Sequence, residues 1–248
     1  MRCLFTFLLF VTGFNLNAQS LEGSWRVKTV NQELVSGIET IMLYQNGYFV
    51  FTSKESGSNH FLGTGGGLYS HQEDGTYSET FDFNSFNGSK VGSTTTGNIK
   101  VTGDEAYVSF LEGDQLKTET WERVSDRKDP LTGVWVITGR KSGDEMISMT
   151  PGARRTVKIL SGGRFQWIAF NSESRDFGGT GGGTYTAENG KYTEHIDFFS
   201  RDDARVGASL QFDFEVKDGK WHHSGLSSKG DPIYEIWSDY REAYLEKK

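Results

Sequence analysis

Four side chains that could move protons or hold an anion lie close together in the second half of the sequence. Tyr192, Glu194 and His195 fall within four residues, and Arg205 follows ten positions after the histidine. Histidine changes charge near neutral pH, and glutamate and tyrosine can also give or take a proton. The planar guanidinium of arginine suits a carboxylate or a sulfate. The set therefore predicts acid/base chemistry on a small anionic molecule such as a sugar acid.

Strand-like alternation decides which of these side chains can share a pocket. Tyr192 and Glu194 fall on the apolar face of their segment, and His195 falls on the other face. Tyr77 and Glu79 repeat the pattern in the first half of the chain. The apolar face should point into a barrel, which places one tyrosine and one glutamate inside each copy. His195 could then meet Glu194 only through a bulge or through barrels packed face to face, and a surface histidine is the alternative.

Interior glutamates leave two interpretations open. A buried carboxylate must be hydrogen-bonded or charge-paired, or its pKa rises. Glu79 and Glu194 could bond to neighbouring tyrosines or to a lysine or arginine as structural groups. They could instead belong to sugar-type pockets with acid/base groups. The second interpretation predicts substrate-binding residues at Trp167, Tyr185, Arg201, Tyr77 and Glu79.

The chain is an internal duplication. Residues 21–25 (LEGSW) recur as 131–135 (LTGVW), and the glycine-rich block 61–69 recurs as 177–185. Three further blocks match in the same order: 77–83 with 192–198, 90–92 with 205–207, and 119–121 with 235–237. These matches predict a first repeat over 19–124, a polar linker over 125–130 closed by a proline, a second repeat over 131–240 and a C-terminal tail over 241–248.

The two copies differ where chemistry could be specialised. His195 stands where the first copy has Thr80, Arg205 stands where it has Lys90, and Arg201 lies in the preceding loop. Duplicated scaffolding can stay alike while one copy acquires chemistry. We therefore expect the specialised site in the second copy.

Several other kinds of site are disfavoured. The single cysteine, Cys3, lies in the predicted N-terminal signal segment, just before its apolar run, and would be removed with it, so neither a disulfide nor a thiol nucleophile is expected in the mature chain. His222 and His223 are adjacent on a predicted strand and point to opposite faces, so they cannot readily bind one metal together. The glycine blocks lack a Lys-Ser/Thr ending, which favours strand bulges or barrel corners over a phosphate loop. No metal and no cofactor is predicted. A net charge of −7, with basic residues scattered among acids, argues against nucleic acid as a partner.

Period-two segments rich in aromatic and β-branched residues predict an all-β protein. Turn signals of the Asn-Gly and Asp-Gly type separate these segments, at 45–47, 73–75, 188–190 and 217–219. Many short strands in about 110 residues per copy predict two tandem antiparallel β-barrels.

The N-terminus has the features of a secretory signal peptide. A basic Arg2 precedes an apolar run over 4–14, and Ala18 precedes a polar Gln19. We expect cleavage after Ala18 and a periplasmic or secreted product. Later segments are too often interrupted by charge to cross a bilayer, so membrane insertion is not expected.

The Gly-x-Trp near the start of each copy resembles the opening of lipocalin-like, or calycin, barrels. In that superfamily the tryptophan closes one end of the barrel, which implies this role for Trp25 and Trp135. Together with the turn spacing and the glycine block, the chain resembles tandem calycin-like secreted proteins of Bacteroidetes over nearly its whole mature length. It lacks the disulfides of the typical lipocalin, and its first copy lacks the usual C-terminal helix pattern. Transport of greasy ligands is therefore not implied.

In general architecture the chain also resembles small secreted proteins encoded with polysaccharide-degrading systems of marine Bacteroidetes. Some of these are dehydratases or lyases that act on uronic-acid ends of oligosaccharides, which implies an exported, cofactor-independent enzyme. Elimination needs a base, a cation that stabilises the enolate-like transition state, and an acid for the departing oxygen. His195 or Tyr192 would be the base, and Arg205 would hold the carboxylate. Glu194 or Tyr185 would be the acid. A non-catalytic lipocalin-like protein that binds a small sugar or an amphiphile is the alternative.

Overall fold

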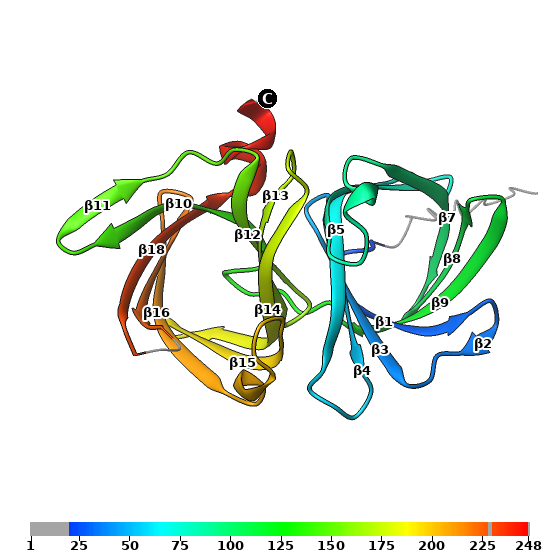
Figure 1. Ribbon diagram of the computed structural model, residues 1–248, viewed down its shortest axis with the longest axis horizontal. Coiled ribbons are helices and arrows are strands. Elements are labelled where there is room, and N and C mark those ends of the chain that lie inside the picture. Colours follow the sequence, from blue (N-terminus) through cyan, green and yellow to red (C-terminus); the bar gives the residue numbers. More distant parts are fainter. Residues whose placement is uncertain (1–19, 228–229, 248) are drawn as a thin grey trace, which may run out of the picture.

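The computed structural model describes residues 20–227 and 230–247, which form two antiparallel β-barrels side by side (Figure 1). In the first barrel eight strands follow one another around the sheet, and the last pairs with the first. They are β1 (Gly23–Val30), β3 (Ile38–Gln45), β4 (Tyr48–Glu55), β5 (Phe61–His71), β6 (Thr76–Asn84), β7 (Thr94–Thr102), β8 (Glu105–Glu112) and β9 (Gln115–Ser125). The short strand β2 (Glu33–Leu34) extends one end of β1.

The second barrel repeats this meander. Its closing pair is β10 with β18, and the short strand β11 extends β10. Its strands are β10 (Gly133–Ser142), β11 (Glu145–Ser148), β12 (Arg154–Ser161), β13 (Arg164–Asn171), β14 (Asp176–Glu188), β15 (Lys191–Phe199), β16 (Ser209–Lys217), β17 (Lys220–Leu226) and β18 (Pro232–Asp239). The predicted fold class, two tandem antiparallel lipocalin-like barrels, is confirmed.

Short helical turns complete each copy. The 3-10 turns η1 (Gly88–Lys90) and η2 (Asp203–Arg205) occupy matching positions after β6 and β15. The helix α1 (Tyr240–Ala243) and the turn η3 (Leu245–Lys247) follow β18. Within the described residues, no helix is long and apolar enough to span a membrane. The predicted signal peptide, residues 1–18, lies outside the described part of the chain.

Strand alternation builds three apolar cores. One lies inside each barrel, because inward-facing residues such as Trp25 and Trp135 are buried there. The third lies between the barrels, where outward-facing residues of β3 and β4 pack against those of β12 and β13. Leu43 and Val50 contribute from the first barrel, and Ile159 contributes from the second. Because both faces of these strands are covered, the two barrels share one continuous structure.

The C-terminal segment belongs to this shared core. Tyr240, Ala243 and Tyr244 are buried there, although the sequence predicted a tail from 241 onward. The Tyr240 hydroxyl donates to Asp82 of the first barrel at 3.0 Å, and it accepts from Arg155 of the second. A tail that docks in this way fixes the two barrels relative to each other.

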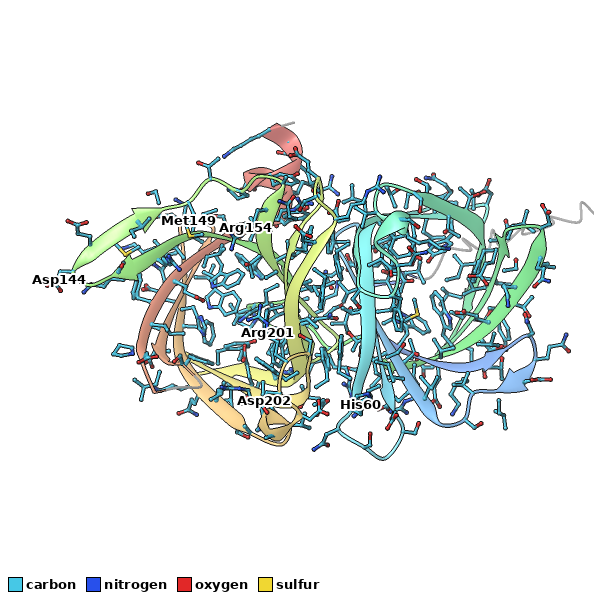
Figure 2. The ribbon with its side chains drawn as sticks, in the orientation of Figure 1. His60, Asp144, Met149, Arg154, Arg201 and Asp202 are labelled. Carbon is cyan, nitrogen blue, oxygen red and sulfur yellow. The ribbon has the colours of Figure 1, made fainter. Side chains whose placement is uncertain are left out.

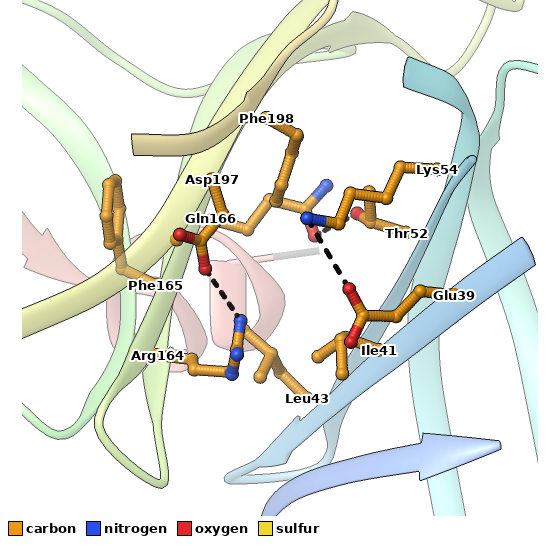
Figure 3. A pocket seen from close by; sticks show the side chains of 11 residues that line it. Glu39, Ile41, Leu43, Thr52, Lys54, Arg164, Phe165, Gln166, Asp197 and Phe198 are labelled. Carbon is orange, nitrogen blue, oxygen red and sulfur yellow. Dashed lines mark hydrogen bonds and ion pairs between the residues drawn. The ribbon is translucent and has the colours of Figure 1, made fainter. Parts of the chain in front are cut away.

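Polar side chains also cross between the barrels. The Arg155 guanidinium lies 2.9 Å from the Asp82 carboxylate and is almost fully buried. Gln166 of β13 accepts from Thr52 and donates to Thr64, both at 2.9 Å. Nearby, ion pairs within each barrel face a small cleft of about 20 Å³ (Figure 3). Its size and its paired charges mark it as packing between the barrels.

The glycine blocks are strand bulges. Register shifts interrupt the ladder at Gly67 of β5 and at Gly183 of β14. A Cβ atom at Gly67 would lie 1.9 Å from the Thr80 carbonyl oxygen, and one at Gly183 would lie 1.9 Å from the His195 carbonyl oxygen. Only glycine allows backbones to approach this closely.

The tryptophan of the Gly-x-Trp motif lies at the start of the first strand in each barrel. Trp25 and Trp135 each donate an indole hydrogen bond to a carbonyl four residues upstream, that of Leu21 at 2.8 Å and that of Leu131 at 2.9 Å. The Arg123 guanidinium covers the Trp25 ring at 4.0 Å. The same guanidinium donates to the carbonyls of Ser20 and Glu22, in the chain that precedes β1.

Candidate functional site

The interior of the second barrel holds a buried ion pair. Lys158 Nζ lies 3.0 Å from Glu194 Oε1, and their side chains are 5% and 7% exposed. Four aromatic rings have their centroids within 5.1 to 6.0 Å of the ammonium, those of Phe165, Tyr192, Trp221 and Trp237. Glu194 is therefore inside the barrel, as alternation predicted, and a lysine neutralises it.

A second pair of titratable groups adjoins this one. His223 Nδ1 lies 3.2 Å from Glu235 Oε2, and Trp237 also donates to this carboxylate. Burial lowers the pKa of His223. Burial alone would raise the pKa of Glu235, but the His223 hydrogen bond and the Lys158 charge outweigh it and lower this pKa. Large side chains and paired charges thus occupy the second barrel.

The remaining predicted catalytic residues lie outside this interior. His195 is exposed, and its Nδ1 lies 2.7 Å from the Ser209 hydroxyl. Arg205 pairs with Asp202 at 3.5 Å and packs over the Phe199 ring. Since His195 and Glu194 point to opposite faces of β15, the structure brings Tyr192 and Glu194 together and leaves His195 apart.

The predicted binding residues of the second copy divide in the same way. Tyr185 is buried inside the barrel, and Trp167 packs edge-on against Phe199. Arg201 is exposed and donates to the Gly178 carbonyl. The loop that follows β15 approaches the first barrel, where His60 Nδ1 lies 3.4 Å from the Asp203 carboxylate, and Figure 2 shows His60 and Asp202 near each other at the lower edge of the view.

The first barrel keeps the scaffold but replaces the large interior groups. Strand pairing aligns Ala106 with Trp221, because these residues face Trp121 and Trp237 respectively. By the same registers Gly97 stands where the second barrel has Phe212, and Thr95 stands where it has Leu210. Of these three residues Thr95 faces open space, whereas Ala106 is buried in the packed core beside Trp121. A cavity of about 530 Å³ occupies the interior of the first barrel.

Apolar side chains form most of the cavity wall. Met42, Val108 and Trp121 lie deep in it, and Phe51 and Phe81 line its sides. Its outer part is lined by Val30, Ile38, Leu62, Phe86, Lys90 and Glu112. Ile38 and Phe86 are exposed, so the mouth is itself apolar.

Two carboxylates face this apolar space. Glu79 Oε1 accepts from the Tyr44 hydroxyl at 2.7 Å, and Tyr44 and Tyr77 hydroxyls lie 3.1 Å apart. Burial raises the pKa of Glu79 to about 7, although hydrogen bonding by the tyrosines acts in the opposite direction. Glu119 accepts from Trp121 Nε1 at 2.7 Å, and burial raises its pKa as well. Tyr77 and Glu79, predicted as binding residues, therefore line a real cavity.

The arrangement suits the binding of a small molecule that is partly apolar. Its volume lies within the range of about 300 to 1,000 Å³ typical of ligand pockets, and few polar groups converge on it. No group of three or more His, Cys, Asp or Glu side chains within residues 20–227 and 230–247 is placed to hold a metal ion.

No family model and no curated protein matches the sequence. An uncharacterized protein, YLR301w from Saccharomyces cerevisiae, has a solved structure that matches with a TM-score of 0.45 and 12% identity. The match covers 86% of this chain and 97% of that one. A likeness at this level carries no argument about function.

The cavity was not predicted, because it depends on the volumes of interior side chains and not on their reactive groups. His195 and Arg205 also differ from the first copy, but they lie on the outside of the barrel. The differences at cavity-lining positions are Met42 against Lys158 and Thr95 against Leu210. Alignment of the two copies strand by strand would have shown them.

Proposed function

We propose that this protein is an exported binding protein whose first barrel holds one small amphiphilic ligand. The observation that carries the proposal is the cavity of about 530 Å³, which has mostly apolar walls and is also lined by Glu79 and Glu119. The second barrel and the shared core act as its support. Export rests on the signal peptide predicted for residues 1–18.

A ligand would enter past the exposed Ile38 and Phe86 and bury its apolar part against Phe81 and Trp121. Its polar end would meet the carboxylates. Burial of apolar surface is worth about 25 cal/mol per Å², so a small aromatic or alkyl group would supply most of the binding energy. The polar contacts would set its orientation.

The test is to fill the cavity. Val108→Trp places an indole in the cavity that Val108 lines, and it should abolish binding of small amphiphiles measured by calorimetry. Tyr107→Trp is the matched control, because Tyr107 is the neighbouring residue on β8 and is exposed. If Val108→Trp folds and binds as tightly as the wild type, the ligand does not occupy this cavity.

Elimination from uronic-acid oligosaccharides is the second candidate, and it keeps one supporting observation. A buried glutamate with a pKa of about 7 has the proton affinity of an acid/base catalyst at neutral pH. Turnover would be followed by the absorbance of the unsaturated product and by its mass. Loss of turnover in Glu79→Gln would place the chemistry in the first barrel, and loss in His195→Ala and Arg205→Ala would place it on the second. Full turnover in all three variants would refute both assignments.

A further inference from the structure

The second barrel shows what the interior of this fold is built to hold. There the Lys158 ammonium sits between Glu194 and a set of aromatic rings, and Glu235 lies near enough for the lysine charge to lower its pKa. Aromatic faces and carboxylates both attract cations, and the attraction is stronger away from water.

The first barrel retains the anionic half of this arrangement. Glu79 aligns with Glu194, since each is paired with a tyrosine of the glycine-block strand, Tyr69 or Tyr185. Glu119 aligns with Glu235 by the pairing of β8 with β9 and of β17 with β18. The rings that correspond to Phe165, Tyr192 and Trp237 are Phe49, Tyr77 and Trp121.

The first barrel has no counterpart of the two groups that pair with these carboxylates in the second barrel, the lysine ammonium and the histidine ring. Met42 stands where Lys158 stands, and Val108 stands where His223 stands. Among the described residues, neither Glu79 nor Glu119 has a cation within 4.0 Å. Lys117, which pairs with Glu112, acts on Glu119 only from a distance, and Lys90 lines the outer part of the cavity. Met42 lines the cavity, so the cavity includes space that the ammonium of a lysine at this position would occupy.

We propose that the ligand of the first barrel carries an organic ammonium group, which takes the place that Lys158 Nζ holds in the second barrel. This inference rests on the proposed binding function and names the chemical class of its ligand. The ammonium lies against Glu79 among the rings of Tyr77 and Trp121, and the apolar body of the ligand extends toward Phe51 and Phe86.

The experiment compares two probes of nearly the same shape, 2-phenylethylammonium and neutral 2-phenylethanol, by titration calorimetry at pH 7.5. We expect the ammonium to bind at least about 10-fold more tightly, as a charge pair shielded from water requires. Glu79→Gln should remove most of this preference while leaving the alcohol's affinity within about 3-fold. Circular dichroism and thermal melting establish that each variant is folded.

Met42→Lys provides the sharper variant, because it recreates the lysine and glutamate pair of the second barrel. It should fold and lose ammonium binding. Ile38→Lys adds the same charge at the mouth and serves as the control, with a smaller loss expected.

The outcomes separate the two proposals. If both probes bind with equal affinity in the cavity, the binding function stands and the ammonium inference is wrong. If the ammonium is preferred but Glu79→Gln and Met42→Lys leave that preference unchanged, the cation binds elsewhere and the inference is also wrong. If a broader panel of neutral, anionic and cationic amphiphiles fails to bind, the proposed function itself falls.

Discussion

Glu79 should make the stability of the ligand-free protein depend on pH in an unusual direction. Its pKa of about 7 in the folded state exceeds its ordinary value of 4.5. The folded protein therefore holds this proton more tightly than the unfolded chain does. The stabilisation is fully present below about pH 4.5 and is lost as pH rises toward about 7. Most glutamates in salt bridges act in the opposite direction.

The magnitude follows from the difference between the two pKa values. At about 1.4 kcal/mol for each tenfold change in proton affinity, the ionised carboxylate costs roughly 3 kcal/mol of folding free energy above pH 7. Gln at this position resembles the protonated acid in shape and stays neutral. Relative to Glu79→Gln, the wild type should lose roughly 3 kcal/mol of stability between pH 4.5 and pH 8.5.

Urea denaturation at several pH values, followed by tryptophan fluorescence, measures this difference. The comparison with Glu79→Gln removes the contributions of all other groups, including Glu119, whose raised pKa acts in the same direction. Glu33→Gln, at an exposed position of β2, should give a curve parallel to that of the wild type. Parallel curves for Glu79→Gln and the wild type would refute the reasoning, because the carboxylate would then ionise as easily inside the barrel as in water.

Other predictions concern the scaffold. Lys158→Met should destabilise the protein by about 3 to 5 kcal/mol by leaving Glu194 without its cation, and adding Glu194→Gln should restore much of the loss in urea denaturation. Gly67→Ala should cost more than about 2 kcal/mol, because its Cβ would meet the Thr80 carbonyl, whereas Gly88→Ala should be nearly neutral in thermal melting. Because the barrels share a core, calorimetry should show one unfolding transition, and two separate transitions would contradict this.

Local signals predicted the fold well. The turn at Asn46 and Gly47 has positive φ at both residues, 48° and 75°, as the Asn-Gly pair indicated. Alternation placed Glu79 and Glu194 inside their barrels because the side-chain period of a strand depends only on neighbouring residues. Bulges, turns and the inward or outward direction of strand side chains are determined by short stretches of sequence.

The site depended on contacts that short stretches do not specify. Lys158 meets Glu194 across 36 positions, and the space beside Glu79 is bounded by Thr95 and Val108, which come from two later strands. The same local motif, Tyr-x-Glu, thus supplies the carboxylate of a closed ion pair in one barrel and part of the wall of a cavity in the other. The outward side chain of His195 drew attention because its chemistry is evident from its type alone.

Duplication explains how the chain can maintain an open interior. Removing one large buried side chain costs about 3 to 5 kcal/mol in an ordinary core, and the first barrel leaves a cavity of about 530 Å³ unfilled. A single domain of about 100 residues has a total stability of only about 5 to 15 kcal/mol. The filled second barrel and the shared core, which includes Val50 and Ile159, supply stability that does not depend on the cavity. A ligand that fills the first barrel would add to this stability in proportion to its occupancy, so binding and folding of the first barrel are linked.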